Sequence, residues 1–142
     1  MSLETSTRHL IDFYTEFNLE SVERLGEVYA QDVVFQDPVN VLHGLGSLQD
    51  YFREMMQGVK SCRFEILSTE LLPTQAAIEW RMFYAHPRLN QGREIVVEGV
   101  SLVTGNDKIK RHRDYFDLGS MLYEHVPVIG YAVKRLKHRL QS

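Results

Sequence analysis

The chain has 142 residues, of which 44% are hydrophobic and 25% are charged, and its formal net charge is −3. This size and composition are typical of one globular domain, so we expect a single domain spanning residues 1–142. The single cysteine, Cys62, excludes an intramolecular disulfide and with it a disulfide-framed secreted scaffold. Apolar runs are too short for a membrane span and residues 1–9 lack a signal-peptide pattern, so we expect a soluble cytoplasmic protein.

The charge is unevenly distributed along the chain. Before position 125 there are 12 Lys and Arg residues against 19 Asp and Glu, whereas four basic and no acidic residues follow Glu124. A basic end could contact an anionic surface, but the preferred interpretation is a solvated last helix whose cations lie at the negative end of its dipole. Because the chain as a whole is acidic, a nucleic-acid partner is not expected.

Helical spacing of apolar residues predicts three helices within about residues 5–58. The first two are separated by a break near Asn18, and the third begins at the capping-box-like sequence Ser47 to Asp50 and ends near Gly58. A short β-rich stretch, Val33 to Phe35, comes before the third helix and ends at Asp37-Pro38.

The hydrophobic period changes to two after residue 60. This pattern predicts strands over residues 63–72, 75–86, 94–104 and 108–116, joined by short turns as in an antiparallel meander. A helical tail over about 119–140 follows, interrupted at Pro127 and Gly130. The predicted fold class is α+β, with the helices packed on one face of a curved sheet that spans about residues 61–117.

Alternation along the strands indicates which side chains share a face. On the second predicted strand, Trp80, Met82 and Tyr84 share an apolar face, opposite Glu79 and Arg81. We expect the Glu79/Arg81 face to lie on the same side of the sheet as His112 and Asp114 of the last strand. If the chain's own helices cover the apolar face, this charged side faces water; if another subunit covers it, the charged side lines a cavity.

Two segments carry a resemblance to a known superfamily. The run from His112 to Leu118 resembles the last strand of limonene-1,2-epoxide hydrolase, and Phe35-Gln36-Asp37-Pro38 followed by Gly44 resembles the SnoaL-like and nuclear-transport-factor-2-like superfamily, which includes ketosteroid isomerase. The resemblance covers about residues 8–130. It implies a cone of N-terminal helices and a strongly bent, mainly antiparallel sheet that encloses an apolar pocket. It also implies a homodimer through the outer sheet face, contacted by Trp80, Met82 and Tyr84.

The epoxide hydrolase pattern assigns roles to individual residues. Asp114 corresponds to the base that activates water, and Arg81 to the arginine that links the two acidic residues. Phe83 stands where the family has the acid that protonates the epoxide, and a phenyl ring cannot donate a proton. Phe35 and Asp37 stand where the family has a Tyr and an Asn that position the water.

The ketosteroid isomerase pattern assigns Asp37 to the proton-shuttling carboxylate. Phe13 and Gly99 occupy the positions of its two oxyanion donors, and Tyr14 is adjacent to the first. SnoaL-type cyclases need only an acid–base Asp and a suitably shaped pocket, so they demand the least of this sequence.

The predicted site combines four catalytic candidates with a set of pocket-lining residues. One hypothesis is an enzyme that performs acid–base or hydrolytic chemistry of the epoxide hydrolase, cyclase or isomerase kind on a small, largely apolar molecule. The alternative is a non-catalytic ligand-binding or protein-interaction domain. His112 and Asp114 together with His86 imitate an iron site, but this spacing is common, so no metal and no cofactor are expected. The catalytic candidates are Asp114, Arg81, Asp37 and His112, and the ligand-binding candidates are Phe35, Glu79, Phe83, Val97, Phe116 and Tyr14.

Overall fold

The strands of the protein form one sheet in the order β2-β1-β6-β5-β4-β3 within residues 2–121 and 129–141, which the computed structural model describes. All neighbouring strands are antiparallel except β1 and β6, which are parallel. The strands are β1 (Tyr29–Gln36), β2 (Val41–His43), β3 (Ser61–Leu71), β4 (Ala76–Ala85), β5 (Ile95–Gly105) and β6 (Ile109–Phe116).

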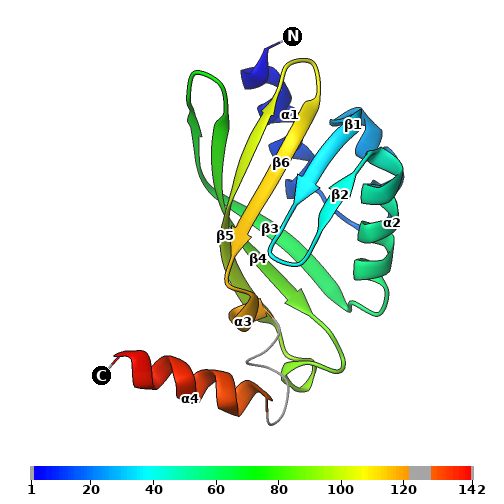
Figure 1. The fold of residues 1–142 in the computed structure, drawn as a ribbon. Coiled ribbons are helices and arrows are strands. Elements are labelled where there is room, and N and C mark those ends of the chain that lie inside the picture. Colours follow the sequence, from blue (N-terminus) through cyan, green and yellow to red (C-terminus); the bar gives the residue numbers. More distant parts are fainter. Residues whose placement is uncertain (1, 122–128, 142) are drawn as a thin grey trace.

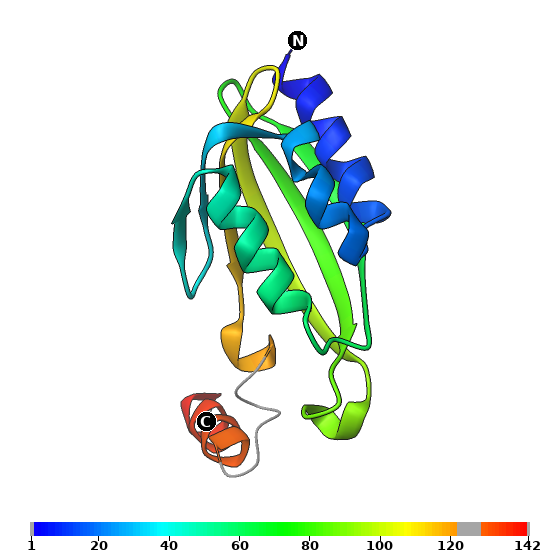
Figure 2. The ribbon, with the colours of Figure 1, turned by 90° about the vertical axis from the view of Figure 1, so that its right-hand side faces the viewer.

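Helices cover one face of this bent sheet and leave the other face exposed (Figure 2). The covering layer consists of α1 (Leu3–Thr15), the 3₁₀ helix η1 (Leu19–Glu27) and α2 (Leu45–Met56). At the end of the sheet where β6 finishes lie α3 (Leu118–Met121) and α4 (Ile129–Gln141), and the short 3₁₀ helix η2 (Asn90–Gly92) lies in the loop between β4 and β5 (Figure 1). The structure is an α+β fold of the expected cone type. No described helix is long and apolar enough to cross a membrane.

Local sequence explains where the helices begin. The Ser2 hydroxyl caps α1 by accepting from the Thr5 amide, and Asn18 and Ser21 form a reciprocal capping box at the start of η1. Gly44 precedes α2 with a φ of 93°, a backbone conformation that glycine adopts without steric cost. These signals fix the residue at which each helix begins.

The four predicted meander strands are confirmed to within two residues at each end. The first strand is longer than expected, because Tyr29 begins β1 and does not continue the second helix. The strand β2 was not predicted. The parallel pairing of β1 with β6 was not predicted either, because two strands so far apart in the sequence leave no local pattern that shows they are neighbours. The predicted break at Pro127 lies outside the described residues.

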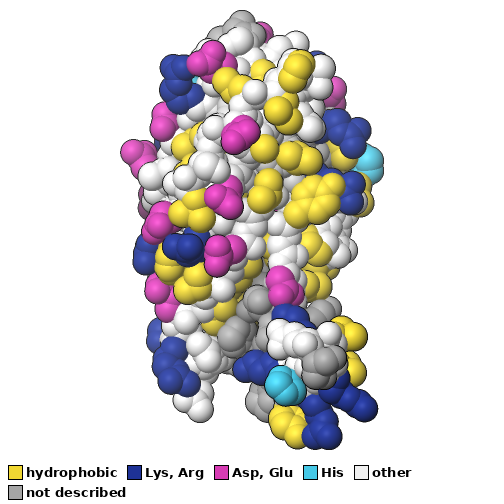
Figure 3. Space-filling view, turned by 90° about the vertical axis from the view of Figure 1, so that its left-hand side faces the viewer, with side chains coloured by type: hydrophobic (Ala, Val, Ile, Leu, Met, Phe, Trp, Pro, Cys, Tyr) yellow, Lys and Arg dark blue, Asp and Glu magenta, His cyan; other side chains and the backbone are white. Residues whose placement is uncertain are grey.

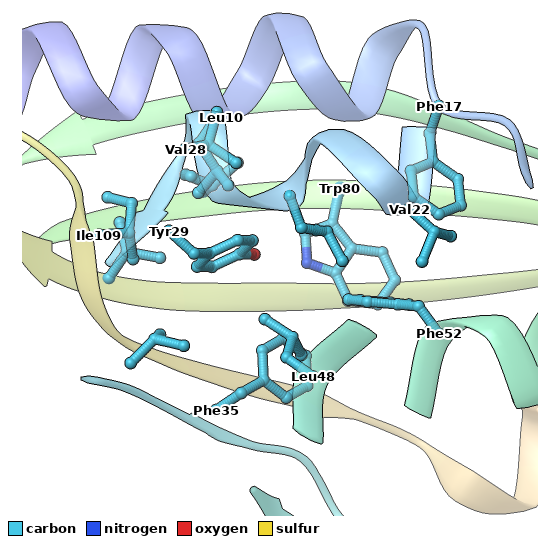
Figure 4. Close-up of a cluster of buried hydrophobic side chains, with 14 of the residues drawn as sticks. Leu10, Phe17, Val22, Val28, Tyr29, Phe35, Leu48, Phe52, Trp80 and Ile109 are labelled. Carbon is cyan, nitrogen blue, oxygen red and sulfur yellow. The ribbon is translucent and has the colours of Figure 1, made fainter. Parts of the chain in front are cut away.

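The core lies between the helices and the inner face of the sheet (Figure 4). Trp80 is 7% exposed and Tyr84 is 9% exposed, and both belong to this core. Met82 packs against it. The placement of Trp80, Met82 and Tyr84 on the outer sheet face is therefore wrong, because the chain's own helices cover them.

Candidate functional site

The polar centre of the covered side of the sheet is a contact between two residues of β6. His112 Nε2 lies 2.6 Å from Asp114 Oδ1. The His112 side chain is 4% exposed and the Asp114 side chain 17% exposed, so water reaches the pair only partly. Residues two apart on a strand point to the same face, and the sequence His112-Arg113-Asp114 therefore places imidazole and carboxylate side by side.

A serine from the neighbouring strand joins this pair. Ser101 Oγ contacts Asp114 Oδ1 and lies 3.2 Å from His112 Nε2. The pairing of Ser101 with Asp114 across β5 and β6 brings the hydroxyl to this position. Trp80 Nε1 donates to Ser101 Oγ over 2.8 Å, which leaves the serine proton to donate to the carboxylate.

Two tyrosines continue the network from the other side of the imidazole ring. The Tyr29 hydroxyl lies 2.7 Å from His112 Nδ1, and the Tyr14 hydroxyl lies 2.8 Å from the Tyr29 hydroxyl. Figure 4 shows the Tyr29 ring directed into the interior from the start of β1, toward the Trp80 indole. Burial raises the pKa of both tyrosines well above the ordinary range, so both hydroxyls keep their protons at neutral pH.

One arrangement of protons satisfies each of these bonds. Tyr14 donates to Tyr29, Tyr29 donates to His112 Nδ1, and the proton on His112 Nε2 is donated to Asp114. This assignment makes the imidazole neutral with its proton on Nε2. The carboxylate then accepts from two donors, Ser101 and His112, through the same oxygen.

The same residue types form the triad of serine hydrolases, but the geometry here differs. In a triad, one imidazole nitrogen faces the serine and the other faces the carboxylate. Here His112 Nε2 faces both Ser101 and Asp114, while Nδ1 faces Tyr29. The imidazole therefore cannot pass a proton from serine to aspartate in the triad manner, and Ser101 is not arranged as a nucleophile.

A small cavity of about 40 Å³ adjoins the network. Asp114 and Tyr14, the two ends of the hydrogen-bonded chain, both line it. Within the described residues no hydrogen bond reaches Asp114 Oδ2, so this oxygen is available to a molecule in the cavity. The volume suits a few waters but is smaller than an organic molecule requires. The other lining residues are Leu10, Ile11, Ile66, Ile78, Trp80, Ser101 and His112.

Three of the predicted site residues lie on the opposite face of the sheet. Arg81 is placed there between Glu65 and Glu98, with nitrogen to oxygen distances of 3.8 and 3.6 Å. Phe83 lies under the Arg63 guanidinium, 3.8 Å from its ring centre. Glu79 is likewise exposed on this outer face. The expectation that these residues face the pocket with Asp114 is thus wrong.

Asp37 lies at the end of β1, where its carboxylate organises a turn. Its Oδ1 accepts from the backbone amides of Val39 and Asn40, each over 2.8 Å, and its Oδ2 accepts from the Tyr51 hydroxyl over 2.7 Å. These three bonds occupy both oxygens. Asp37 does not line the cavity beside Asp114.

The other predicted residues do lie on the covered side. The Phe35 ring packs against the His112 ring at a tilt of 40° with centroids 4.6 Å apart, and the Phe116 and Trp80 ring centroids are 6.1 Å apart. Val97 is buried in the core. Tyr14 reaches the network despite its offset from the position expected of an oxyanion donor.

Sequence reasoning missed Ser101, Tyr29 and the site role of Trp80. Alternation correctly grouped His112 with Asp114 and Trp80 with Tyr84 within their own strands. Which faces of β4 and β6 lie on the same side of the sheet depends on how both strands pair with β5, where Ser101 pairs with Ile78 on one side and Asp114 on the other. The signal available in the sequence was the polar Ser101 among inward positions of β5 that otherwise carry Ile95, Val97, Gly99 and Val103.

Among the residues that the structure describes, no group of three or more His, Cys, Asp or Glu side chains is arranged to hold a metal ion. His86 lies at the end of β4 and lines a different hollow from His112.

Comparison with known proteins identifies the family of this chain. Residues 10–112, most of the chain, match the SnoaL-like domain. A search of curated proteins finds no significant match.

Solved structures of related folds agree with this match. A nuclear-transport-factor-2-like protein of unknown function from Burkholderia pseudomallei K96243 superposes with a TM-score of 0.73 at 14% identity, over 87% of this chain and 98% of that one. A protein from Jannaschia sp. CCS1 classed with the SnoaL-like polyketide cyclases superposes with a TM-score of 0.74 at 11% identity, over 86% and 92% of the two chains. A protein of ketosteroid isomerase-like fold from Catenulispora acidiphila DSM 44928, in complex with trimethylamine, gives a TM-score of 0.68 at 17% identity, over 80% and 87%. The chain belongs to the SnoaL-like domain family and has the nuclear-transport-factor-2-like fold.

Proposed function

We propose that this protein binds a small, largely apolar organic molecule at the internal site and transfers protons on it, with Asp114 as the base. The observation that carries the proposal is that a carboxylate and a tyrosine hydroxyl line one cavity and are joined by hydrogen bonds through a histidine. A base and a hydrogen-bond donor facing the same space are what proton abstraction next to a carbonyl group requires.

Each polar residue has a defined part in this chemistry. Asp114 Oδ2 accepts the proton from the bound molecule or from a water beside it. His112 donates from Nε2 to the other carboxylate oxygen and so holds the carboxylate in place. The Tyr14 hydroxyl turns from Tyr29 to the oxygen on which negative charge develops, which it stabilises as a donor.

Arg81 and Asp37 have no part in this mechanism. Arg81 lies on the other face of the sheet, and the Asp37 carboxylate is occupied by its turn and by Tyr51.

Part of the cavity wall has to move for an organic molecule to bind, because about 40 Å³ admits only water. Leu10 and Ile11 of α1 form the apolar side of this wall. The small volume is also the observation that favours the second candidate, a non-catalytic binding or interaction domain that retains the network as a structural element.

Hydrogen–deuterium exchange tests the two candidates without knowledge of the natural substrate. A panel of small aryl and alkyl ketones is incubated with the protein in deuterated buffer, and α-deuteration is followed by mass spectrometry. We expect exchange on at least one ketone, slowed at least 100-fold in Asp114→Asn, on the order of a general base's contribution. Asp37→Asn is the matched control and retains the rate.

Two outcomes would decide against the enzyme. Equal rates in the wild type and Asp114→Asn would remove Asp114 as the base. Ketones that bind, as measured by calorimetry, but never exchange would establish the non-catalytic alternative.

We also infer that the exposed sheet face pairs with a second copy of the chain. Val96 and Tyr115 are each 45% exposed on this face, and Figure 3 shows hydrophobic side chains spread among acidic and basic ones over it. Light scattering of Tyr115→Lys tests the proposal, since a charge at this position should convert the dimer to monomers. A wild-type protein that is monomeric at all concentrations would contradict it.

The expected cytoplasmic location stays a prediction.

A further inference from the structure

A second hollow, much larger than the cavity beside Asp114, opens at the end of the fold where β4 finishes. Its volume is about 420 Å³, which falls in the range of ~300–1,000 Å³ typical of ligand pockets. Its lining comes from the C-terminal end of α2, the start of β3, the end of β4 and the loop after β4. The lining residues are Met55, Met56, Val59, Cys62, Met82, Tyr84, His86, Arg88 and Leu89.

The two spaces lie along the same inner sheet face but are separate. On β4, Tyr84 and Met82 line the large hollow, and Trp80 lines the small cavity. Phe64 of β3 packs against Trp80 with centroids 6.3 Å apart, and Phe17 of the loop after α1 packs against Phe64 at 6.0 Å. The two sites share no described lining residue.

The walls of the large hollow are apolar and adaptable. Met55, Met56 and Met82 contribute three flexible thioether side chains, which fit irregular apolar shapes. Burial raises the pKa of the Cys62 thiol to about 11 and that of the Tyr84 hydroxyl, with a contribution from Cys62, to about 12, so neither contributes a negative charge at neutral pH.

The polar groups of this hollow favour an anion. Arg88 is exposed at its edge, and its guanidinium forms no hydrogen bond or ion pair with a described residue. His86 Nδ1 accepts from the Arg88 amide over 3.1 Å, so the proton of the neutral ring is on Nε2 and is free to donate. No Asp or Glu is among the described residues that line the hollow. Among the residues that the structure describes, the apolar space is therefore edged by the donors of Arg88 and His86 and by no carboxylate.

We propose that this hollow is a binding site for a small amphiphile with an apolar body and one anionic head, such as an aliphatic carboxylate. The body lies among the methionines, and the head lies at the edge between Arg88 and His86. This assignment does not depend on the chemistry proposed for Asp114.

Calorimetry with three decyl compounds tests the assignment, each below its micelle concentration. Decanoate carries the anionic head, decanol carries no charge, and decyltrimethylammonium carries the opposite charge on the same chain. We expect decanoate to bind at least tenfold more tightly than decanol, and decyltrimethylammonium to bind most weakly. Equal affinity for the three compounds, or no binding of decanoate, would overturn the proposal.

Variants locate the site and separate it from the cavity at Asp114. Arg88→Gln should weaken decanoate about tenfold, a change typical of losing one charge-assisted contact, and leave decanol unchanged. The matched control, Arg111→Gln, removes the same charge from the outer face and should change neither. Met55→Trp, a substitution at a residue 42% exposed, should fill the hollow and abolish binding of both compounds.

Asp114→Asn should bind decanoate as the wild type does. Decanoate affinity that changes in Asp114→Asn but not in Met55→Trp would place the ligand at the other cavity and overturn this proposal. The ketone exchange reaction fails or succeeds independently of this result.

Discussion

His112 Nε2 lies 2.6 Å from Asp114 Oδ1, and both side chains project from β6 into the space between the sheet and its covering helices. On the other side of the ring, Nδ1 lies 2.7 Å from the Tyr29 hydroxyl. The imidazole therefore connects a carboxylate on one strand to a hydroxyl on the parallel neighbour β1. Such a buried polar network stabilises the fold only if each member keeps its partners.

Ser101→Ala should destabilise the protein by about 1–3 kcal/mol, because it leaves the buried Trp80 Nε1 without an acceptor. Denaturant unfolding followed by fluorescence measures this directly, since Trp80 is the only tryptophan. Ser68→Ala is the matched control: its hydroxyl lies on an exposed part of β3, so the free energy of unfolding should change by less than ~0.5 kcal/mol. Equal effects of the two substitutions would contradict the role given to Ser101.

Gly99→Ala should be strongly destabilising, because an added Cβ would lie 2.5 Å from Trp80 Cζ2 and 2.8 Å from the Tyr115 carbonyl oxygen. Overpacking of this kind costs about 1–3 kcal/mol. Gly46→Ala in α2 meets no atom within 4 Å and should be neutral or slightly stabilising. Thermal unfolding and the near-ultraviolet circular dichroism of Trp80 report both; a Gly99→Ala protein as stable as the wild type would show that the indole is placed differently.

Alkaline pH should destabilise the fold through its buried tyrosines. Burial raises the pKa of Tyr14 and Tyr29 above their unfolded value of 10.0, so the native state favours the protonated form. Their contribution to stability is complete below pH 10 and is lost as pH rises further. The free energy of unfolding should therefore fall above pH 10, and fall less steeply in Tyr29→Phe. A slope identical in wild type and variant would contradict the burial of this hydroxyl.

The Cys62 thiol should react slowly with a disulfide reagent. Burial raises its pKa from 9.0 to about 11, which lowers the thiolate fraction at pH 8 about 100-fold. The rate should increase about tenfold per pH unit between pH 8 and 10. The same thiol in denaturant serves as the control and should react as an ordinary cysteine. Rapid reaction of the folded protein at pH 8 would mean that the thiol is exposed.

The elements of the fold were predictable because their signals are local. Alternation over residues 63–116 predicts the meander, and the helical period predicts α1 and α2. The strand β2 has three residues and lies at the edge of the sheet beside β1, so it leaves too short a pattern to detect. The early start of β1 at Tyr29 is set by its parallel pairing with β6, which is a tertiary contact.

The site was predictable in part for the same reason. Alternation alone placed His112 and Asp114 on one face of β6. Which residues of β4 lie on that same side of the sheet depends on the register between the strands. Trp80 pairs with Gly99, which pairs with Phe116, and this places the indole on the side of Asp114 and Arg81 on the other. The sequence alone suggested that the apolar face and the polar residues lie on opposite sides of the sheet. Both can lie on the covered side, because the buried polar residues form hydrogen bonds with one another.

The protonation of His112 tests the central claim of a connected interior network most directly. Nitrogen-15 NMR of the histidine side chains at neutral pH, with the His112 signal assigned by its loss in His112→Gln, distinguishes the two ring nitrogens. We predict a neutral ring with its proton on Nε2 and a hydrogen-bonded, unprotonated Nδ1 whose shift changes in Tyr29→Phe. Exchange-averaged shifts of a solvent-exposed imidazole, unaffected by Tyr29→Phe, would contradict the network and the proton-transfer site built on it.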